Sequence, residues 1–431
     1  MTTFLVGVCL AALLVLGVPI AVSLALAGGF TFLMVYGPTL GVASLAHIPY
    51  DALSGFVVAA VPLYMFMGQL MLEGGIGRDL FDFAEWCAGR LPGGLVLASI
   101  LACAIFAAIS GSTAATVASI GVVALPEMLR RGYGRPIAAG ALACAGGLGI
   151  LIPPSITFIL YASVTNVSVG KLFMAGVVPG IMLAILYSVY VVLREWWRPS
   201  PGIVRIEQDG QPHRVRLHWG MAWGILTVPL LLGGIYVGWY TPTEGAAMGV
   251  GYALLVTVVF KRSLKWDGFV RSVRAATSSS AMILAIIVGA KIFGTAISLL
   301  HVPQDVVAWM DGLNLHTWQF LIAINILFLI LGCFLDAAAV VLVTVPILLP
   351  TLQLLHIDLI WFGVILVINM ELGAITPPVG VNLYVIQAIR RDYSIGEILN
   401  GALPFALIGL SGLALVMIFP EIALWLTHGV K

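Results

Sequence analysis

Residues 148–156 read LGILIPPSI, and residues 372–380 read LGAITPPVG. Each stretch places two adjacent prolines inside a long apolar run. Proline has no backbone N–H, so an unbroken helix would leave the carbonyls four residues earlier without partners. Those carbonyls belong to Gly149 and Ile150 in the first stretch and to Gly373 and Ala374 in the second. The two stretches therefore predict two broken helices.

The composition is that of a membrane protein. The 431 residues are 61% hydrophobic and 9% charged, whereas soluble domains carry about 25% charged residues. Many apolar runs reach the ~20 residues that a helix needs to cross a bilayer. We therefore predict an all-α, multi-pass protein whose immediate surroundings are lipid. The formal net charge of +1 indicates neither an anionic nor a cationic partner, and nothing suggests nucleic-acid binding.

Several functional classes lack support in the sequence. The first apolar run, 4–36, is too long for a signal peptide and predicts a membrane helix, either long or broken near Gly28–Gly29. The five cysteines form no CxxC pair and the seven histidines have no ligand spacing, so we expect no transition-metal site. No nucleophile–base cluster is evident, and we expect no enzyme. There is also no Walker A motif to support ATP hydrolysis.

An internal repeat covers most of the chain. Pro153 and Pro377 are 224 residues apart, as are Pro126 and Pro350, and SGSTAATVASIGVVALP (110–126) aligns on FLDAAAVVLVTVPILLP (334–350) at the same offset. Shared offsets at several landmarks indicate a duplicated unit. We assign 1–197 to the first repeat, 198–240 to a cytoplasmic loop and linking helix, and 241–431 to the second repeat.

Each repeat is expected to contain a helical hairpin followed by a broken helix. The first hairpin is predicted at about 92–131, with arms at 92–109 and 113–130, and the first broken helix at about 137–166. Their counterparts are predicted at about 315–355, with arms at 316–334 and 338–355, and at about 359–390. The flanking helices are predicted at 52–73, 171–193, 219–240, 243–262, 276–300 and 402–427, with amphipathic stretches at 78–90 and 303–312.

Basic residues set the expected orientation, because Lys and Arg favour cytoplasmic loops. The outer ends of the first hairpin carry Arg78, Arg90, Arg130, Arg131 and Arg135. Both ends then lie in the cytoplasm, and the hairpin is re-entrant. The ends of the second hairpin, DGLNLHT and TLQLLHID, contain no Lys or Arg and belong on the opposite side. The sequence thus predicts an inverted repeat, with Arg390 and Arg391 on the cytoplasmic side.

The breaks and hairpin tips together predict cation sites. Free carbonyls at membrane depth persist only beside protein, water or an ion, and broken helices in inverted repeats mark ion sites in secondary transporters. The first tip supplies hydroxyl groups on Ser110, Ser112, Thr113 and Thr116. The second supplies Asp336, for which a proton site or a helix N-cap is the alternative. Hard oxygen ligands favour Na⁺ over a transition metal.

Three further residues are candidates for substrate binding. Lys291 lies mid-run in AIIVGAKIFGTAIS and either meets a substrate carboxylate or pairs with Asp336 inside the protein. Ser155 follows the first proline pair. Asn382 follows the second and serves either the ion or the substrate.

These motifs resemble the large membrane subunit of tripartite ATP-independent periplasmic (TRAP) transporters, the DctM family. The resemblance is carried by SGSTAATVASIGVVALPEM, GLGILIPPSI, YTPTEGAA, LDAAAVVLVTVPILLP and LGAITPPVGVNLYV, and it spans essentially the whole chain. It implies a bacterial inner-membrane location, an elevator mechanism and Na⁺-driven import of an organic acid. It also implies two partners, a small four-helix membrane subunit and a periplasmic substrate-binding protein. We expect the small subunit to be a separate chain.

The resemblance further implies two sets of Na⁺ ligands. The first comprises Ser110, Ser112, Gly149, Ile152 and Pro154, and the second comprises Asp336, Gly373, Thr376 and Val379. The first tip, GSTAAT, has no acidic residue, so that site depends on hydroxyl and carbonyl oxygens. Competing readings are a stand-alone divalent-anion or antiporter elevator without a binding protein, an intramembrane enzyme, and a passive channel.

Overall fold

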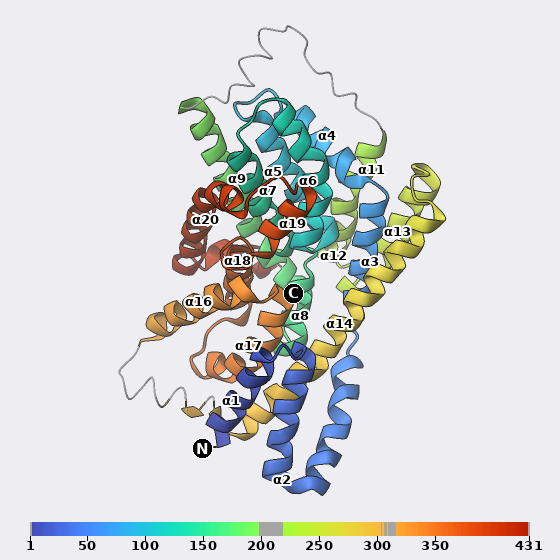
Figure 1. Cartoon of the computed structure of the whole chain (residues 1–431). Coiled ribbons are helices and arrows are strands. Elements are labelled where there is room, and N and C mark those ends of the chain that lie inside the picture. Colours follow the sequence, from blue (N-terminus) through green and yellow to red (C-terminus); the bar gives the residue numbers. More distant parts are fainter. Residues whose placement is uncertain (1, 198–218, 303, 306–307, 309–315, 430–431) are drawn as a thin grey trace.

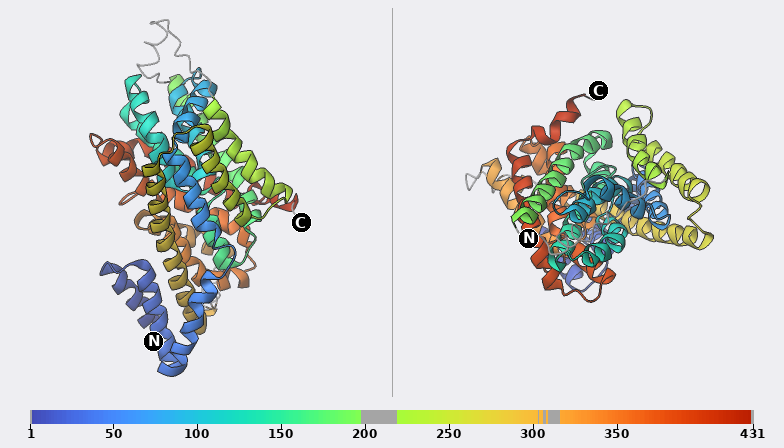
Figure 2. Two further views of the ribbon diagram at one scale, coloured as in Figure 1. Left: turned by 90° about the vertical axis from the view of Figure 1, so that its right-hand side faces the viewer. Right: turned by 90° about the horizontal axis from the view of Figure 1, so that it is seen from above.

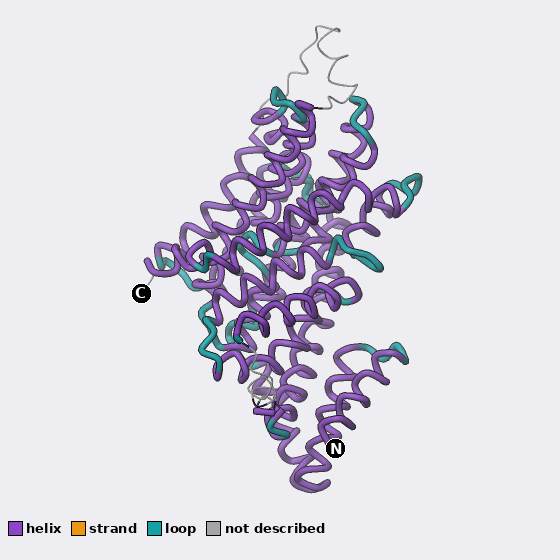
Figure 3. Tube along the Cα trace, turned by 90° about the vertical axis from the view of Figure 1, so that its left-hand side faces the viewer, coloured by secondary structure: helices purple, strands orange, loops and turns teal. Residues whose placement is uncertain are grey.

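A computed structural model of the chain describes residues 2–197, 219–302, 304–305, 308 and 316–429. Within these ranges the protein is built from helices without a β-strand (Figures 1 and 3). Nine of the described helices are long and apolar enough to cross a membrane. They include α9 (Val169–Trp197) and α14 (Trp266–Leu299). The prediction of an all-helical, multi-pass protein is confirmed.

Both predicted hairpins appear as pairs of consecutive helices joined by very short turns. The first consists of α5 (Gly94–Ser110) and α6 (Thr113–Arg130), and the second of α16 (Thr317–Phe334) and α17 (Ala337–Leu354). Gly111 ends α5 with a φ of 59°, a left-handed conformation that glycine adopts with little steric cost. The Ser112 side chain then accepts a hydrogen bond from the Ala115 amide and caps α6.

Both helices with paired prolines are interrupted at the predicted places. In the first, α7 (Arg135–Gly147) continues into the short 3₁₀ segment η1 (Leu148–Ile150), and α8 (Ile156–Thr165) follows the prolines. In the second, α18 (Leu359–Gly373) is separated from α19 (Val381–Ile389). Each break covers the positions where proline removes the amide donor, which is the expected physical cause.

The remaining helices make up the rest of the described structure. Where α11 continues past Pro229, the missing amide coincides with a short π-helix, so the expected linking helix at 219–240 is not uniform. Figure 2 shows α14 running along most of the length of the molecule. The bounds are α1 (Thr2–Val15), α2 (Ile20–Leu53), α3 (Ala60–Glu73), α4 (Ile76–Ala88), α11 (Trp219–Val228), η2 (Pro229–Gly233), α12 (Gly234–Val237), α13 (Pro242–Leu254), η3 (Leu255–Phe260), α20 (Ile395–Ile418), α21 (Glu421–Leu424) and η4 (Trp425–Gly429).

The N-terminal region differs from the prediction. The run 4–36 was expected to form a helix that is either long or broken near Gly28–Gly29. The chain is interrupted instead between α1 and α2, and α2 is helical at the glycine pair, where a Cβ atom on Gly28 would lie 2.9 Å from the backbone of Phe293. Glycine at this position therefore permits close packing against α14. The chain reverses instead at Gly37, whose φ is 75°. Gly41 then lies directly against the Phe32 carbonyl, so α2 folds back on itself beside the lower part of α14 (Figure 1).

Other boundaries shift for local reasons. The helix expected at 276–300 begins earlier, at Trp266, because the more polar residues 266–275 belong to the same helix and lie outside the apolar run. The helix expected at 402–427 begins at Ile395, where Ser394 and Glu397 form a capping box, and α20 ends at Ile418. The helix expected at 52–73 starts at Ala60. Most of the amphipathic stretch expected at 303–312, and the central loop at 198–218, lie outside the described residues.

Candidate functional site

The first hairpin tip packs directly onto the first helix break. A Cβ atom on Gly149 would lie 2.6 Å from the Ser112 carbonyl oxygen and 2.8 Å from Thr116 Oγ1. A Cβ atom on Gly111 would lie 2.9 Å from the Pro154 carbonyl oxygen. Only glycine leaves room for the two backbones to approach this closely. The fold therefore brings four predicted ligands together: Ser110 and Ser112 from the tip, and Gly149 and Pro154 from the break.

Polar oxygens of the first tip are concentrated in a buried cluster. The hydroxyls of Ser110 and Thr116 are 2.8 Å apart, and Thr116 donates a hydrogen bond of 2.8 Å to the Ser112 carbonyl. Ser110 is 3% exposed and Thr116 is fully buried. Ile152 is also a predicted ligand. Its side chain packs against Gly180 of α9, and only its backbone could supply an oxygen. The cluster thus offers hydroxyl and carbonyl oxygens and no charge.

The hydrogen bonding of the two carbonyls in the first break differs from the prediction that both would be free. The Ile150 carbonyl, expected to be free, accepts a hydrogen bond from the Ser155 hydroxyl. Ser155 also caps α8 by accepting from the Phe158 amide at 3.3 Å. Its side chain is thus already engaged in holding the break together. The Gly149 carbonyl accepts no hydrogen bond from the described residues, and it is the oxygen that the break leaves open.

The second hairpin meets the second break in a similar way. Gly332 of α16 and Gly373 of α18 approach so closely that a Cβ atom on Gly373 would lie 2.6 Å from the Gly332 Cα. The amides of Val379 and Gly380 donate to the Cys333 carbonyl at 3.2 and 3.4 Å. The loop after Pro377–Pro378 is therefore attached to the end of the first hairpin arm.

Asp336 lies at the opening of this second assembly. It occupies the N-cap position of α17 but makes no capping hydrogen bond by its side chain. The residue is exposed, and Val379 is also 37% exposed. The Thr376 hydroxyl donates to the Leu372 carbonyl at 2.6 Å. The second assembly is thus open and carries a carboxylate, whereas the first is closed and neutral.

The carbonyls freed by the second proline pair have partners. The Gly373 carbonyl accepts from the Thr376 amide at 3.2 Å, and the Ala374 carbonyl accepts from the Asn382 amide at 3.0 Å. The expectation that both would be unpaired is wrong, because the loop folds back onto the helix end. A carbonyl has two lone pairs, so each oxygen can still take a second contact.

Two predicted substrate residues occupy very different surroundings. Lys291 is exposed on α14 and forms no ion pair with Asp336 within the described chain, so the internal pairing that the sequence left open is absent. Asn382 is fully buried and donates to the Ala143 carbonyl of α7 at 2.8 Å. Its side-chain oxygen has no hydrogen-bond partner.

The sequence reasoning passed over one buried ionisable side chain on α18, Glu371, which lies two residues from Asn369, a polar residue that the sequence singles out beside the second break. Glu371 is fully buried, and its Oε1 accepts from the Tyr187 hydroxyl at 3.0 Å. Asn369, also fully buried, donates to Asn325 of α16 and thereby joins the second hairpin to α18. The signal was present, since Glu371 is a lone ionisable residue in an apolar run, the same property that singled out Asp336.

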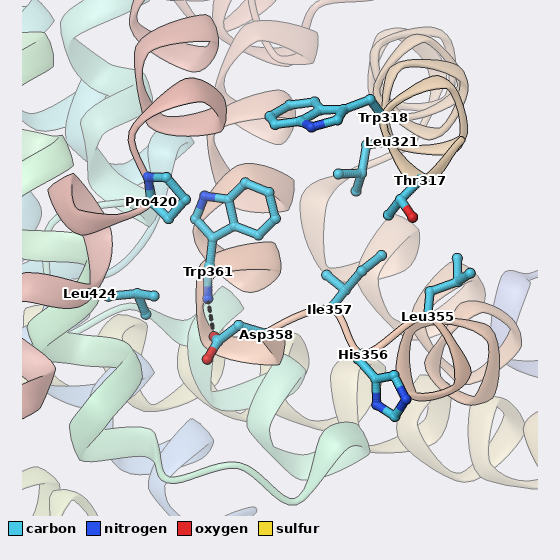
Figure 4. A pocket seen from close by; sticks show the side chains of 10 residues that line it. All are labelled: Thr317, Trp318, Leu321, Leu355, His356, Ile357, Asp358, Trp361, Pro420 and Leu424. Atoms are coloured by element: carbon cyan, nitrogen blue, oxygen red, sulfur yellow. Dashed lines mark hydrogen bonds between the residues drawn. The ribbon is translucent and has the colours of Figure 1, made fainter. Parts of the chain in front are cut away.

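Two cavities lie away from both breaks. One, of about 320 Å³, is formed where α17 ends and α18 begins, and Trp318 and Trp361 meet edge to face at its wall (Figure 4). Asp358 at its edge is engaged in capping α18 through the amides of Ile360 and Trp361. The other, of about 460 Å³, lies between α4, α6 and the segment that follows η3, beside the Asp79–Lys261 ion pair. Neither contains a predicted Na⁺ ligand.

The whole chain can be compared with known protein families. Residues 7–422 match the model of a protein family described as "Tripartite ATP-independent periplasmic transporter, DctM component". The chain belongs to the DctM family. This result confirms the resemblance inferred from the motifs, and it extends over almost the whole chain.

Relatives of this DctM-family chain align over nearly their full length. A C4-dicarboxylate TRAP transporter large permease of Pseudomonas aeruginosa is 39% identical over 94% of both chains. One of Rhodobacter capsulatus is 37% identical over 99% of both chains. An ectoine TRAP transporter large permease of Halomonas elongata is 30% identical over 99% of both. All three are named as transport subunits, in agreement with the expectation that this chain is not an enzyme.

Solved structures of other transporters share the fold. The YdaH transporter of Alcanivorax borkumensis superposes with a TM-score of 0.61, covering 91% of this DctM-family chain and 90% of its own, at 15% identity. MtrF of Neisseria gonorrhoeae superposes with a TM-score of 0.55, covering 88% and 85%, also at 15% identity. At such low identity the similarity concerns the fold alone.

Proposed function

We propose that this chain is the Na⁺-coupled membrane permease of a tripartite transporter that imports a carboxylated organic solute. The observation that carries the proposal is the first tip packed onto the first break. There, the hydroxyls of Ser110 and Thr116, the Ser112 carbonyl and the open Gly149 carbonyl gather around one point of close backbone approach. Such oxygen-rich helix breaks are where secondary transporters bind their coupling ions.

The chemistry of both assemblies favours Na⁺. Hydroxyl, carbonyl and carboxylate oxygens are hard ligands that suit a hard cation. The described residues contain no group of three or more His, Cys, Asp or Glu side chains able to hold a metal ion. In the first site Ser110, Ser112, Gly149, Ile152 and Pro154 would supply neutral oxygens. In the second, Asp336, with Gly373, Thr376 and Val379, would offset the charge of the ion.

The substrate class is inferred from relatives and from charge. Two relatives at 37% and 39% identity are named for C4-dicarboxylates, and the relative at 30% identity is named for ectoine. Lys291, exposed on α14 and unpaired with Asp336, would meet such an anion. Asn382 would contact the substrate through its side-chain amide at the second break, and Ser155 would contact it at the first.

The partners and the arrangement of the transporter are inferred from the family to which the chain belongs. The large permease would work with a separate small four-helix membrane subunit and a periplasmic substrate-binding protein in the bacterial inner membrane. The two repeats, 1–197 and 241–431, would be inverted relative to one another and joined through 198–240. The hairpins and broken helices would move together against the other helices as an elevator. Contacts of the hairpins with the breaks support treating them as one moving unit.

Reconstituted transport tests this function. Proteoliposomes containing the chain, its small subunit and its binding protein are assayed for C4-dicarboxylate uptake with an inward Na⁺ gradient and with K⁺ in its place. We expect uptake to require Na⁺ and to be lost on Asp336→Ala. Uptake driven by a proton gradient alone would contradict Na⁺ coupling and would recast Asp336 as a proton site.

A stand-alone carrier is the second candidate. It is kept because YdaH and MtrF, which are described as a transporter and as an efflux pump, share the fold. Leaving out the binding protein in the same assay separates the two candidates. Undiminished uptake without it would support the stand-alone carrier.

A further inference from the structure

The two broken helices make an especially close contact at Gly147 and Glu371. A Cβ atom on Gly147, the last residue of α7, would lie 2.3 Å from Cγ and 3.1 Å from Cδ of Glu371. The backbone of α7 therefore rests directly on the Glu371 side chain. Gly147 and Glu371 are separated by 224 residues, the offset of the repeat. The contact thus joins equivalent positions, each two residues before the glycine that opens its break.

A third helix holds this contact in place. The Tyr187 hydroxyl of α9 donates to Glu371 Oε1 at 3.0 Å. The Tyr187 ring packs edge to face on Phe405 of α20, with the ring centres 5.7 Å apart. Glu371 and Tyr187 are both fully buried. The Glu371 side chain is therefore fixed by α7, α9 and, through the tyrosine, α20.

Burial of this carboxyl group carries an energetic cost. Glu371 Oε2 has no hydrogen-bond partner in the described chain, and no Lys or Arg side chain there pairs with it. A buried polar group with incomplete hydrogen bonding destabilises the folded chain, and an apolar side chain of similar size would not. The position of Glu371 between the two breaks offers a functional reason for burying a carboxyl group there.

We propose that Glu371 is a positioning residue that couples the two cation sites, an inference that rests on the proposed Na⁺ coupling. An ion at the first site draws Gly149 and the end of α7 toward the hairpin tip. Gly147 moves with them and presses on Glu371, which carries the shift to Gly373 at the second site. Close-packed contacts transmit such small shifts because they cannot deform continuously. Binding at one site then alters affinity at the other.

The test uses the whole chain with a readout of ion binding. Equilibrium binding of radiolabelled Na⁺ to the purified chain in detergent is measured against NaCl concentration, with KCl keeping the ionic strength constant, and the melting temperature of each variant is recorded in KCl. For the unmodified chain we expect a sigmoidal dependence on Na⁺. Glu371→Ala should make it hyperbolic and raise the half-saturating Na⁺ concentration about fivefold or more, the usual minimum for coupled sites. Glu371→Gln, which can still accept from Tyr187 and pack on Gly147, should restore the sigmoidal curve.

A matched control separates coupling from simple loss of a buried polar group. Ser99 of α5 is fully buried, and its hydroxyl bonds the Leu95 carbonyl of its own helix and the Met128 sulfur of α6, with no hydrogen bond to either break. Ser99→Ala should lower the melting temperature in KCl without changing the shape of the Na⁺ curve. Tyr187→Phe provides a second variant if Glu371→Ala does not fold, and should flatten the curve in the same direction.

The outcomes distinguish this inference from the function on which it rests. A sigmoidal curve that persists in both Glu371→Ala and Tyr187→Phe would overturn the coupling role while leaving Na⁺ binding intact. A Glu371→Gln variant as impaired as Glu371→Ala would also overturn it, because position alone would then be insufficient. If the unmodified chain binds no Na⁺, the proposed function fails, and the coupling role fails with it.

Discussion

The guanidinium of Arg135 lies 3.1 Å from the carboxylate of Asp392, although 257 residues separate them, and 4.2 Å above the ring of Tyr393. Arg135 begins α7, and Asp392 follows α19. The contact therefore joins the start of one broken helix to the end of the other. Arg390 also pairs with Asp392 at 2.9 Å. Basic residues that the charge pattern assigned to one side of the membrane thus lie together around a single carboxylate.

This cluster predicts a dependence of stability on pH. Hydrogen bonds from Arg390 hold the pKa of Asp392 far below its ordinary value of 3.8. A carboxyl group with a lowered folded-state pKa stabilises the protein above its unfolded-state pKa, and this contribution is lost as the pH falls toward the folded-state value. We expect the melting temperature to exceed that of Asp392→Asn at pH 6 to 7, with the difference shrinking below about pH 4. A constant difference across that range would contradict the assignment.

The hydroxyl of Thr116 should contribute to the first cation site. It lies 2.8 Å from Ser110 Oγ and meets the backbone of Gly149. Thr116→Val removes the oxygen while keeping the shape, and should raise the half-saturating Na⁺ concentration for uptake by about tenfold, equivalent to ~1.4 kcal/mol. Thr344→Val is the matched control, because that buried hydroxyl bonds only the Val340 carbonyl of its own helix. Equal effects of the two variants would argue against a Thr116 role in ion binding.

Gly149 should tolerate no side chain. Gly149→Ala would place Cβ 2.6 Å from the Ser112 carbonyl and force the first tip away from the break. We expect Na⁺-dependent uptake to fall at least about tenfold, since overpacking costs roughly 1–3 kcal/mol. Gly251→Ala on α13 meets no atom within 4 Å and should leave uptake unchanged. Normal uptake by Gly149→Ala would show that the tip and the break need not approach this closely.

The contact of α7 with α20 should control stability. A Cβ atom on Gly401 would lie 1.8 Å from the Pro136 carbonyl oxygen, whereas one on Gly396 of the same helix meets nothing within 4 Å. Gly401→Ala should lower the free energy of unfolding by about 1–3 kcal/mol and reduce the melting temperature in detergent. Gly396→Ala should leave it unchanged or slightly raised, because alanine favours helix. A Gly401→Ala variant as stable as the unmodified chain would mean that the helices separate at little cost.

Much of the architecture could be predicted because its causes are local. Proline removes a backbone donor wherever it lies, so Pro153 and Pro377 marked the breaks without knowledge of any neighbour. Apolar length marked the membrane helices in the same way. The glycine pair Gly28–Gly29 left open whether the first helix is broken there, because the reason for the pair is not local: Gly28 accommodates the backbone of α14.

The sequence by itself determined that the chain is a multi-pass helical protein with two hairpins and two broken helices, and its motifs identified the family. Only the tertiary structure decided which oxygens remain open. Loops folded back to pair the carbonyls of Ile150, Gly373 and Ala374, while that of Gly149 has no partner among the residues that the structure describes. It also placed Glu371 against Gly147. Backbone breaks are set by the chemistry of single residues. The partners of the freed carbonyls depend on how the loop after each proline pair folds, and the contact of Glu371 with Gly147 joins segments that meet only in the folded chain.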